Sequence, residues 1–304
     1  MNKSKIVLSL FDGISGTQVA LDRNGVKVGK YYASEIDKFP IAITQKNYPN
    51  TIQLGSVANW QDWDIDWASI DLVVGGFPCQ AWSNAGLKQG DKDPRGQLFW
   101  TMLDVMKKVL ANNPQAKFLM ENVRMKKEFE EYITFHTEEA LGKVNKHLIN
   151  SALVSAQNRK RFYWTNIDGI DQPEDQGLVL SDILMNPGQL LFDRPCELKD
   201  FDPKAECHHA ATATDINGHD SLKRVYADTG KSPTINTMGG GNREPKVLVS
   251  DLIPTYRKLR PCECEALQTF PIGYTEGISN SQRYKCLGNS FTVSVVSDIL
   301  SYAF

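Results

Sequence analysis

One cysteine stands where its chemistry would explain its position better than burial would. Cys79 follows Gly75, Gly76, Phe77 and Pro78 directly after a short apolar run. Glycines and a proline predict a rigid turn just past a buried strand, where a thiolate can act as a nucleophile. The alternative is an inert buried thiol, which is the usual state of a free cysteine. The proline before the thiol and the polar residue after it argue against simple burial.

Two further segments carry groups that could assist such a nucleophile. The segment FLMENV places Glu121 and Asn122 at the end of another expected strand. A partly desolvated carboxyl there could have a raised pKa and donate a proton, although a helix-capping or ion-paired glutamate is the ordinary alternative. The segment SAQNRKRFYW groups Arg159, Lys160 and Arg161. Strand alternation would place the two arginines on one face, where they could hold an anion, but most charge clusters are solvated faces.

The N-terminal segment LSLFDGISGTQVAL has the form of a ligand-binding turn. Gly13 and Gly16 lie between an apolar run and a helical pattern, so the backbone could approach a ligand at a helix N-terminus. Glu35 lies about one strand–helix unit further on, where an acid can accept from ribose hydroxyls. Phe11 and Asp12 occupy the place where a dinucleotide fingerprint would begin, so this is not that motif. Taken alone, such a turn is as often structural as ligand-binding.

These chemical groups follow the carboxyl ends of the expected strands, which is where open α/β sheets place their ligands. Apolar runs that predict strands alternate with helical patterns and occupy residues 6–10, 31–34, 71–74 and 117–120. This alternation predicts an α/β fold with a Rossmann-like parallel sheet. From about 167 to 254 the periodicity fades and Gly, Pro, Asp, Asn and Thr become frequent. We expect a smaller, irregular and partly β domain there, with regular patterning again at 262–270 and a last helix from about 291 to 302.

Composition limits the classes of protein that this chain can represent. Its 304 residues contain 34 Lys and Arg against 36 Asp and Glu, so binding of a polyanion would need a local basic surface. No stretch approaches the roughly 20 apolar residues of a membrane span, and no cleavable signal pattern begins the chain. Six cysteines at irregular spacing do not form a disulfide framework. We therefore expect a soluble, cytoplasmic protein without a membrane partner.

Taken together and in this order, the segments resemble the DNA (cytosine-5)-methyltransferase family. FDGISG is similar to its S-adenosyl-L-methionine (AdoMet) loop, GGFPCQ to its nucleophile motif, ENV to its proton-donor motif and QNRKR to its arginine motif. RKLRPCECEALQTFP and LGNSFTVSVV resemble its last two motifs. SLFDGI and VSAQNRKRFYW look more like the catalytic domain of the vertebrate de novo enzymes, and RVYADTGKSPTINTMGGGNREPKVL looks like phage or prophage members.

The resemblance implies a mechanism and a cofactor. Cys79 would add as a thiolate to ring carbon 6 of a cytosine flipped out of double-stranded DNA, and the methyl group of AdoMet would pass to ring carbon 5. Glu121 would protonate or hydrogen-bond ring nitrogen 3, while Arg161, together with Arg159, would stabilise the base carbonyl. The family's cofactor pocket corresponds to Phe11, Asp12, Gly13, Gly16, Glu35, Ile36, Ser56, Val57, Pro78, Leu98, Asn289 and Ser290.

Ser56 departs from the family's pattern, because an acidic residue often contacts the adenine amino group there. Its hydroxyl or a backbone group could substitute. We expect contacts to DNA from the polar segment after the cysteine and from the insert, namely from Gln80, Ser83, Lys88, Arg95, Arg224 and Arg243. Arg194, Lys223 and Lys246 are further candidates. We expect a catalytic domain over 1–166, completed by 280–304, a target-recognition domain over 167–279, and a monomer.

Two other functions stay open at this point. An RNA (tRNA) cytosine-5 methyltransferase has the same fold, but the chain lacks the Cys-Phe-Thr segment of that branch. A catalytically silent DNA-binding relative would not require a thiol, a carboxyl and an arginine in these motifs. We expect no metal, because the insert's cysteines and histidines lack the cysteine spacing of structural zinc sites. The DNA sequence recognised, and membership of a restriction–modification system, cannot be read from these residues.

Overall fold

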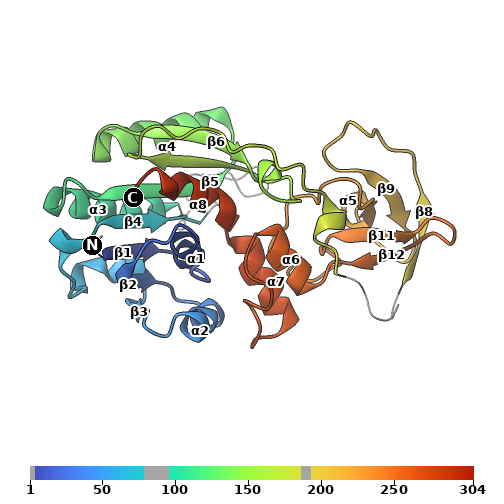
Figure 1. Cartoon of the computed structure of the whole chain (residues 1–304), viewed down its shortest axis with the longest axis horizontal. Coiled ribbons are helices and arrows are strands. Elements are labelled where there is room, and N and C mark those ends of the chain that lie inside the picture. The colour runs from blue at the N-terminus through green and yellow to red at the C-terminus, as the bar shows by residue number, and fades with distance from the viewer. Residues whose placement is uncertain (1–3, 79–95, 186–192) are drawn as a thin grey trace. The chain divides into compact units, whose positions relative to one another are not determined.

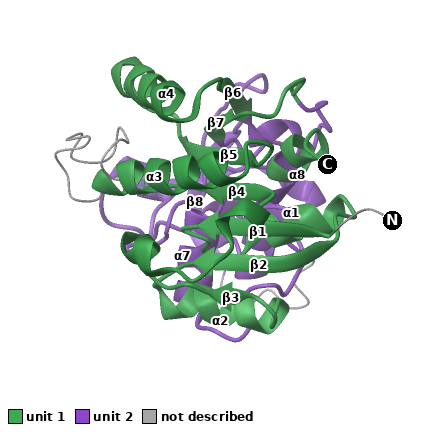
Figure 2. Ribbon diagram, turned by 90° about the vertical axis from the view of Figure 1, so that its left-hand side faces the viewer, with its two compact units in different colours: residues 1–149, 160–172, 296–304 green, residues 150–159, 173–295 purple. Residues whose placement is uncertain are grey.

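The computed structural model describes residues 4–78, 96–185 and 193–304, which form two compact units (Figure 2). Unit 1 comprises residues 1–149, 160–172 and 296–304, and unit 2 comprises 150–159 and 173–295. This division differs from the predicted domain boundaries, because 150–159 and most of 280–304 belong to unit 2. The reason for the first difference is hydrogen bonding: Ser155 Oγ donates to Leu267 O, and the Ser232 amide donates to Ala156 O.

Unit 1 is built on a seven-stranded sheet in the order β3-β2-β1-β4-β5-β7-β6 (Figure 1). Its strands are β1 (Lys5–Leu10), β2 (Val28–Ser34), β3 (Ile52–Gln53), β4 (Leu72–Gly75), β5 (Lys117–Val123), β6 (Asn145–Asn150) and β7 (Lys160–Thr165). β1 pairs in parallel with both β2 and β4, β4 pairs in parallel with β5, and β7 runs antiparallel to β5. The strand order reverses between β1 and β4, which is where doubly wound sheets bind ligands. The predicted α/β, Rossmann-like class is confirmed.

Apolar strands and an amphipathic helix form the core of unit 1. The α-helices associated with the sheet are α1 (Gly16–Arg23), α2 (Lys38–Asn47), α3 (Gln97–Asn112), α4 (Lys127–Leu141) and α8 (Val293–Ser301), the last beginning in unit 2. Two short 3-10 helices, η1 (Val57–Asp62) and η2 (Trp67–Ser69), precede β4. On α3, Phe99, Met102 and Met106 are buried against Val73 and Phe118 of the sheet. This packing fixes the strand ends that carry the candidate site.

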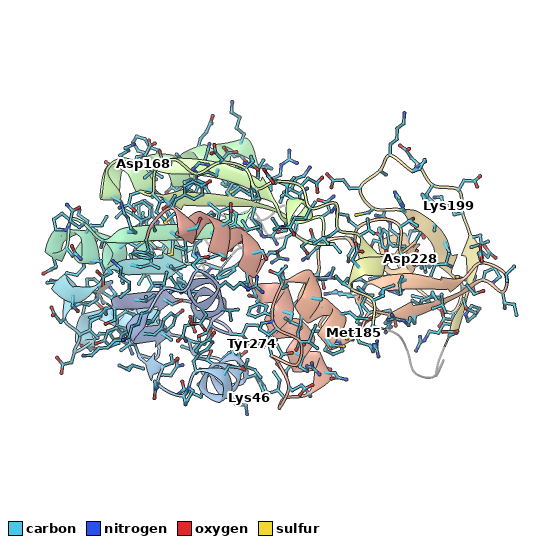
Figure 3. All side chains as sticks on the ribbon, viewed as in Figure 1. Lys46, Asp168, Met185, Lys199, Asp228 and Tyr274 are labelled. Atoms are coloured by element: carbon cyan, nitrogen blue, oxygen red, sulfur yellow. The ribbon has the colours of Figure 1, made fainter. Side chains whose placement is uncertain are left out.

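Unit 2 contains a small closed barrel with the strand order β10-β11-β12-β8-β9. Its strands are β8 (Arg194–Leu198), β9 (His209–Ala213), β10 (Arg224–Tyr226), β11 (Lys246–Ser250) and β12 (Thr255–Lys258). Its helices are η5 (Ser151–Leu153), η6 (Leu180–Asp182), α5 (Asp220–Lys223), α6 (Pro261–Leu267) and α7 (Asn280–Asn289). Tyr256 and Val225 are buried in the barrel. Phe270 and Tyr274 pack after α6 with ring centroids 4.8 Å apart; Tyr274 is labelled in Figure 3.

Two negative findings apply to the described residues. None of the helices formed by 4–78, 96–185 and 193–304 is long and apolar enough to cross a membrane. Within the same ranges, no three His, Cys, Asp or Glu side chains are grouped so that they could hold a metal ion. Cys207 and His209, two of the residues considered for zinc, therefore form no such group with other described residues.

Candidate active site

The candidate residues of unit 1 meet at one edge of its sheet. Residues 11–16 follow β1, Glu35 follows β2, residues 76–78 follow β4, and Glu121 lies near the end of β5. Since β1, β2, β4 and β5 are parallel neighbours, their carboxyl ends lie at the same edge. The predicted nucleophile, Cys79, comes next after this edge in the chain. It lies outside the described residues, as do Gln80, Ser83, Lys88 and Arg95.

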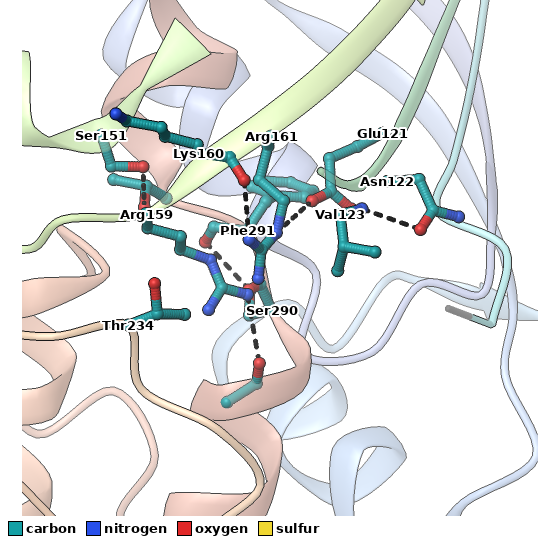
Figure 4. Close-up of polar contacts among 12 residues, drawn as sticks. Glu121, Asn122, Val123, Ser151, Arg159, Lys160, Arg161, Thr234, Ser290 and Phe291 are labelled. Carbon is teal, nitrogen blue, oxygen red and sulfur yellow. Dashed lines mark hydrogen bonds and ion pairs between the residues drawn. The ribbon is translucent and has the colours of Figure 1, made fainter. Parts of the chain in front are cut away.

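Glu121 and Arg161 form an ion pair across two strands (Figure 4). The antiparallel register of β5 and β7 pairs Val123 with Arg161 and Glu121 with Tyr163. Arg161 Nε lies 3.1 Å from Glu121 Oε1, and the two side chains are only 11% and 17% exposed. Charges that are shielded from water in this way interact more strongly than an exposed pair does. Arg161 Nη1 also donates to Lys160 O at 2.8 Å, which fixes the plane of the guanidinium.

Two backbone features connect Glu121 and Asn122 to the turn that leads to the cysteine. A Cβ on Gly76 would lie 3.2 Å from Glu121 Oε2, which is a tight contact, so the glycine lets the carboxylate approach this turn closely. The buried Asn122 side chain donates from Nδ2 to Phe77 O at 3.0 Å, and its Oδ1 accepts from the Val123 amide at 2.8 Å. The end of β5 therefore holds residues 76–77 in place. Sequence reasoning singled out Asn122 by its position but gave it no such role.

Arg159 is placed differently from the prediction. The strand β7 begins at Lys160, so the prediction that Arg159 and Arg161 share a strand face is wrong. Arg159 belongs to unit 2 and is 3% exposed. Its Nη1 donates to Ile235 O at 2.9 Å and its Nη2 donates to Gly288 O at 3.1 Å. Nη2 also donates to Ser290 O at 2.7 Å (Figure 4). A cation at the end of α7 satisfies its last carbonyl groups.

The loop after β1 is held by a carboxylate from the loop after β2. Glu35 Oε2 accepts from the Gly13 amide at 2.9 Å, and Glu35 Oε1 accepts from the amides of Ile36 and Asp37 at 2.7 and 2.8 Å. Gly13, with a φ of 58°, adopts the left-handed conformation that favours glycine. Ile36 is 76% exposed although it is a large apolar residue. An exposed apolar side chain beside an oriented carboxylate suits a planar base attached to a sugar.

Asp12 sits in a network of hydroxyl groups beneath the same loop. Tyr31 Oη donates to Asp12 Oδ1 at 2.7 Å, and the Ser15 hydroxyl donates to Asp12 Oδ2. Burial is the main cause that raises the pKa of Asp12 from 3.8 to about 6, opposed by the hydroxyl donors. Ser15 is itself fixed by contacts of its hydroxyl with Gln18 Nε2 and Thr44 Oγ1, each at 3.2 Å. Sequence reasoning missed Tyr31 and Ser15, because Tyr31 reads as an ordinary strand residue.

The other residues assigned to the cofactor are placed as follows. Ser56 caps η1, with its Oγ accepting from the Ala58 amide at 3.2 Å. Val57 is buried, and Phe11 and Leu98 are partly buried against the core of unit 1. Pro78 is the last described residue before the cysteine, and Gly16 begins α1. Asn289 and Ser290 end α7 in unit 2. Three features of unit 1 fit a nucleoside with an amino-acid tail. They are the left-handed backbone of Gly13, the oriented carboxylate of Glu35 and the exposed apolar side chain of Ile36.

The structure describes the surroundings of three basic residues in the insert that were expected to contact DNA. Arg224 begins β10 and Arg243 follows a loop of left-handed residues, and both are exposed. Lys246 is not a surface contact, because it is 3% exposed and its Nζ donates to Asn242 O at 2.7 Å and Glu244 O at 3.0 Å. Burial also lowers the pKa of Lys246 to about 8. The expectation that Lys246 touches DNA is therefore wrong.

Solved structures that are similar to this chain include methyltransferases. The chain is similar to the methyltransferase EhMeth of Entamoeba histolytica, with a TM-score of 0.73, 17% identity and coverage of 100% of this chain and 98% of the other. It is also similar to the Dnmt2 methyltransferase of S. pombe, with a TM-score of 0.64, 18% identity and coverage of 98% of each chain. These likenesses show a methyltransferase fold.

The sequence then identifies the family. The family model described as C-5 cytosine-specific DNA methylase matches residues 6–303, so the chain belongs to this family of enzymes. The type II methyltransferase M.NlaX of Neisseria lactamica is 28% identical over 306 residues, which cover 96% of this chain and 94% of the relative. The orphan methyltransferase M.SPBetaI of Bacillus phage SPbeta is 27% identical and covers 96% of both chains. The resemblance inferred from the motifs is confirmed, as is the class of enzyme.

Proposed function

We propose that this chain binds AdoMet and methylates ring carbon 5 of a cytosine that it flips out of double-stranded DNA, with Cys79 as the nucleophile. The observation that carries the proposal is the shielded Glu121–Arg161 pair beside the turn that leads to the cysteine. Its nitrogen and oxygen atoms lie 3.1 Å apart. The Glu121 carboxylate packs against Gly76, three residues before Cys79. An acid, a guanidinium and a thiol are the groups that this reaction needs.

The chemistry follows from the weak nucleophilicity of cytosine at carbon 5. Addition of the Cys79 thiolate forms a bond from sulfur to carbon 6, while Glu121 gives a proton or hydrogen bond to nitrogen 3, so electron density rises at carbon 5. Bound AdoMet would supply an electrophilic methyl group on its sulfonium. Carbon 5 would bond to that methyl carbon as the bond from the methyl carbon to the sulfonium sulfur breaks, with S-adenosylhomocysteine as the leaving group. A base then removes the proton from carbon 5, the sulfur–carbon bond breaks, and the ring double bond and the thiolate return.

Arg161 has the donors to act on both the acid and the base. A guanidinium has five N–H groups. Within the described chain its ion pair with Glu121 uses Nε, and its hydrogen bond with Lys160 uses Nη1. We assign Nη2 to the carbonyl oxygen of the target base. General acid assistance of this kind contributes about 10²–10⁴-fold to a rate. The guanidinium of Arg159, by contrast, donates to backbone carbonyl groups, so we assign it no contact with the base.

The cofactor residues divide by the part of AdoMet that they would meet. Phe11 and Ile36 would lie against the adenine, and Glu35 would accept from the ribose hydroxyls. The three backbone amides already bound to Glu35 fix its orientation, and Oε2, which accepts from Gly13 alone among them, has a second lone pair for a hydroxyl. The amino-acid end would meet Asp12 and Gly13. The remaining pocket residues that we propose are Gly16, Ser56, Val57, Pro78, Leu98, Asn289 and Ser290.

For DNA, we propose that the segment after Cys79 and the barrel unit both contribute. Arg224 and Arg243 are exposed basic side chains on the barrel unit, and such groups mostly contact phosphates. Gln80, Ser83, Lys88 and Arg95 complete the proposed set. Flipping the base costs a few kcal/mol, which contacts of this kind would offset.

The test is transfer of labelled methyl groups from AdoMet to double-stranded DNA and, separately, to tRNA. The wild type should label DNA, and Cys79→Ser should not. Equal incorporation by both would refute the covalent mechanism, while labelling of tRNA alone would favour an RNA methyltransferase. Bisulfite mapping of DNA from cells that express the wild type should then reveal a single methylated motif.

A further inference from the structure

Asp12 is a shielded acid that has no cationic partner among the described residues. The groups that face it are the hydroxyls of Ser9 on β1, Tyr31 on β2 and Ser15 before α1, together with the carboxylate of Glu35. Glu35 is another acid, so its charge disfavours ionisation of Asp12. A buried carboxylate needs a paired cation or hydrogen bonds to remain charged. Hydroxyl groups donate such hydrogen bonds to Asp12, but no described residue provides a cation to pair with it.

The geometry of these hydroxyls fixes the carboxyl in one orientation. Tyr31 approaches Oδ1 and Ser15 approaches Oδ2, so both oxygens are held from within the protein. Tyr31 is buried on β2, and Ser15 is anchored by Gln18 and Thr44. Ser9 is a third hydroxyl donor, so of the four lone pairs of the carboxylate one is left for a further donor. A ligand that offers a cationic donor would therefore find this carboxyl already oriented.

We propose that Tyr31 and Ser15 are positioning residues that orient Asp12 to receive the α-ammonium group of the methionine part of AdoMet. This inference rests on the proposed function, because it assigns one end of the same cofactor. The ammonium group is compact, positively charged and carries three donors, so it matches a carboxyl that lacks a cation. The adenine end would be held by other residues, and its binding should not depend on these two hydroxyls.

Strand β2 offers a matched control. Tyr31 and Tyr32 are consecutive, so their side chains point to opposite faces of the sheet. Tyr32 packs in the core cluster with Leu8 and Leu10. Phenylalanine at either position removes only a hydroxyl group. Selective loss at position 31 would therefore report the contact with Asp12.

The experiment is calorimetric titration of the full chain with S-adenosylhomocysteine and with its analogue that lacks the amino group. Tyr31→Phe should bind S-adenosylhomocysteine about tenfold more weakly than the wild type does, equivalent to about 1.4 kcal/mol. It should bind the deaminated analogue as the wild type does. Tyr32→Phe should change neither affinity selectively. Circular dichroism of each variant checks that it is folded.

A second variant tests the same inference without strain. Ser15 has a φ of 55°, a conformation that glycine adopts freely, so Ser15→Gly removes the hydroxyl at little cost to the backbone. It should show the same selective loss as Tyr31→Phe. Equal weakening of both ligands by folded variants, or no weakening of either, would overturn the inference. If the wild type binds neither ligand, the proposed cofactor and hence the inference both fail.

Discussion

Replacing Asp12 with asparagine should stabilise the folded protein at neutral pH in the absence of ligand. Burial raises the pKa of Asp12 from 3.8 to about 6, opposed by hydrogen bonds from Ser15, Ser9 and Tyr31. At about 1.4 kcal/mol for each tenfold change in proton affinity, ionised Asp12 costs the folded state about 3 kcal/mol. Asparagine carries no charge and still accepts from Tyr31, although a neutral acceptor is weaker. We therefore expect a net gain of about 1–2 kcal/mol in the free energy of unfolding.

The contribution of Asp12 to the free energy of unfolding depends on pH. Folded Asp12 holds its proton more tightly than unfolded Asp12 does, so its contribution to stability falls as the pH rises from 3.8 through about 6. Below that window the carboxyl is neutral in both states, and the wild type and Asp12→Asn should differ little.

The assay is urea unfolding of both proteins at pH 4 and pH 7.5, followed by tryptophan fluorescence. The stability difference in favour of the variant should grow between these two pH values. A difference that is the same at both, or a variant that is less stable at pH 7.5, would show that ionised Asp12 does not destabilise the folded protein. Since the variant lacks the charge proposed to hold the ammonium group, it should also bind S-adenosylhomocysteine more weakly.

Three other substitutions test separate parts of the site. Arg161→Lys should lower the single-turnover rate of methyl transfer by about 10²-fold or more, since lysine has no Nε–H and no second Nη group for the base, while the affinity for S-adenosylhomocysteine stays unchanged. An unchanged rate would contradict this role. Asn122→Ala should lower the free energy of unfolding by about 1–3 kcal/mol, because the Phe77 carbonyl loses a buried donor. Urea titrations measure this change, and a variant as stable as the wild type would show that the contact is dispensable. Arg224→Ala should weaken DNA binding and reduce the slope of log affinity against log salt by about one, and an unchanged slope would exclude a phosphate contact.

The catalytic sheet could be predicted from the sequence because each of its central strands contains a short apolar run. The predicted strands at 6–10, 31–34, 71–74 and 117–120 overlap β1, β2, β4 and β5. Strands buried on both faces give continuous apolar runs that end abruptly at polar residues. The same abrupt ends located Glu35 and Glu121 at the edge of the sheet. The local sequence pattern was sufficient to predict these strands and to place the two carboxylates near their ends.

Features that depend on distant parts of the chain escaped prediction. The barrel strands of unit 2 have three to five residues each, and their pairing joins segments far apart in sequence. The prediction for Arg159 was wrong because its backbone groups bond to Asn150 and Ser151. The Arg159 amide donates to Asn150 Oδ1 and the Arg159 carbonyl accepts from the Ser151 amide, so β7 begins one residue later, at Lys160. The hydroxyl of Tyr31 could not be linked to Asp12 without the register of β1 and β2.

In the proposed mechanism, the Cys79 sulfur bonds to ring carbon 6 of cytosine before the methyl group is transferred. The most direct measurement uses double-stranded DNA in which the target cytosine carries fluorine at carbon 5. Fluorine cannot leave as a proton does, so the covalent complex cannot resolve after methyl transfer. With AdoMet, the wild type should form a protein–DNA adduct that survives denaturing electrophoresis, and mass spectrometry should place it on Cys79. An adduct on another residue, or methylation of ordinary DNA without any adduct on the fluorinated DNA, would contradict a covalent intermediate on Cys79.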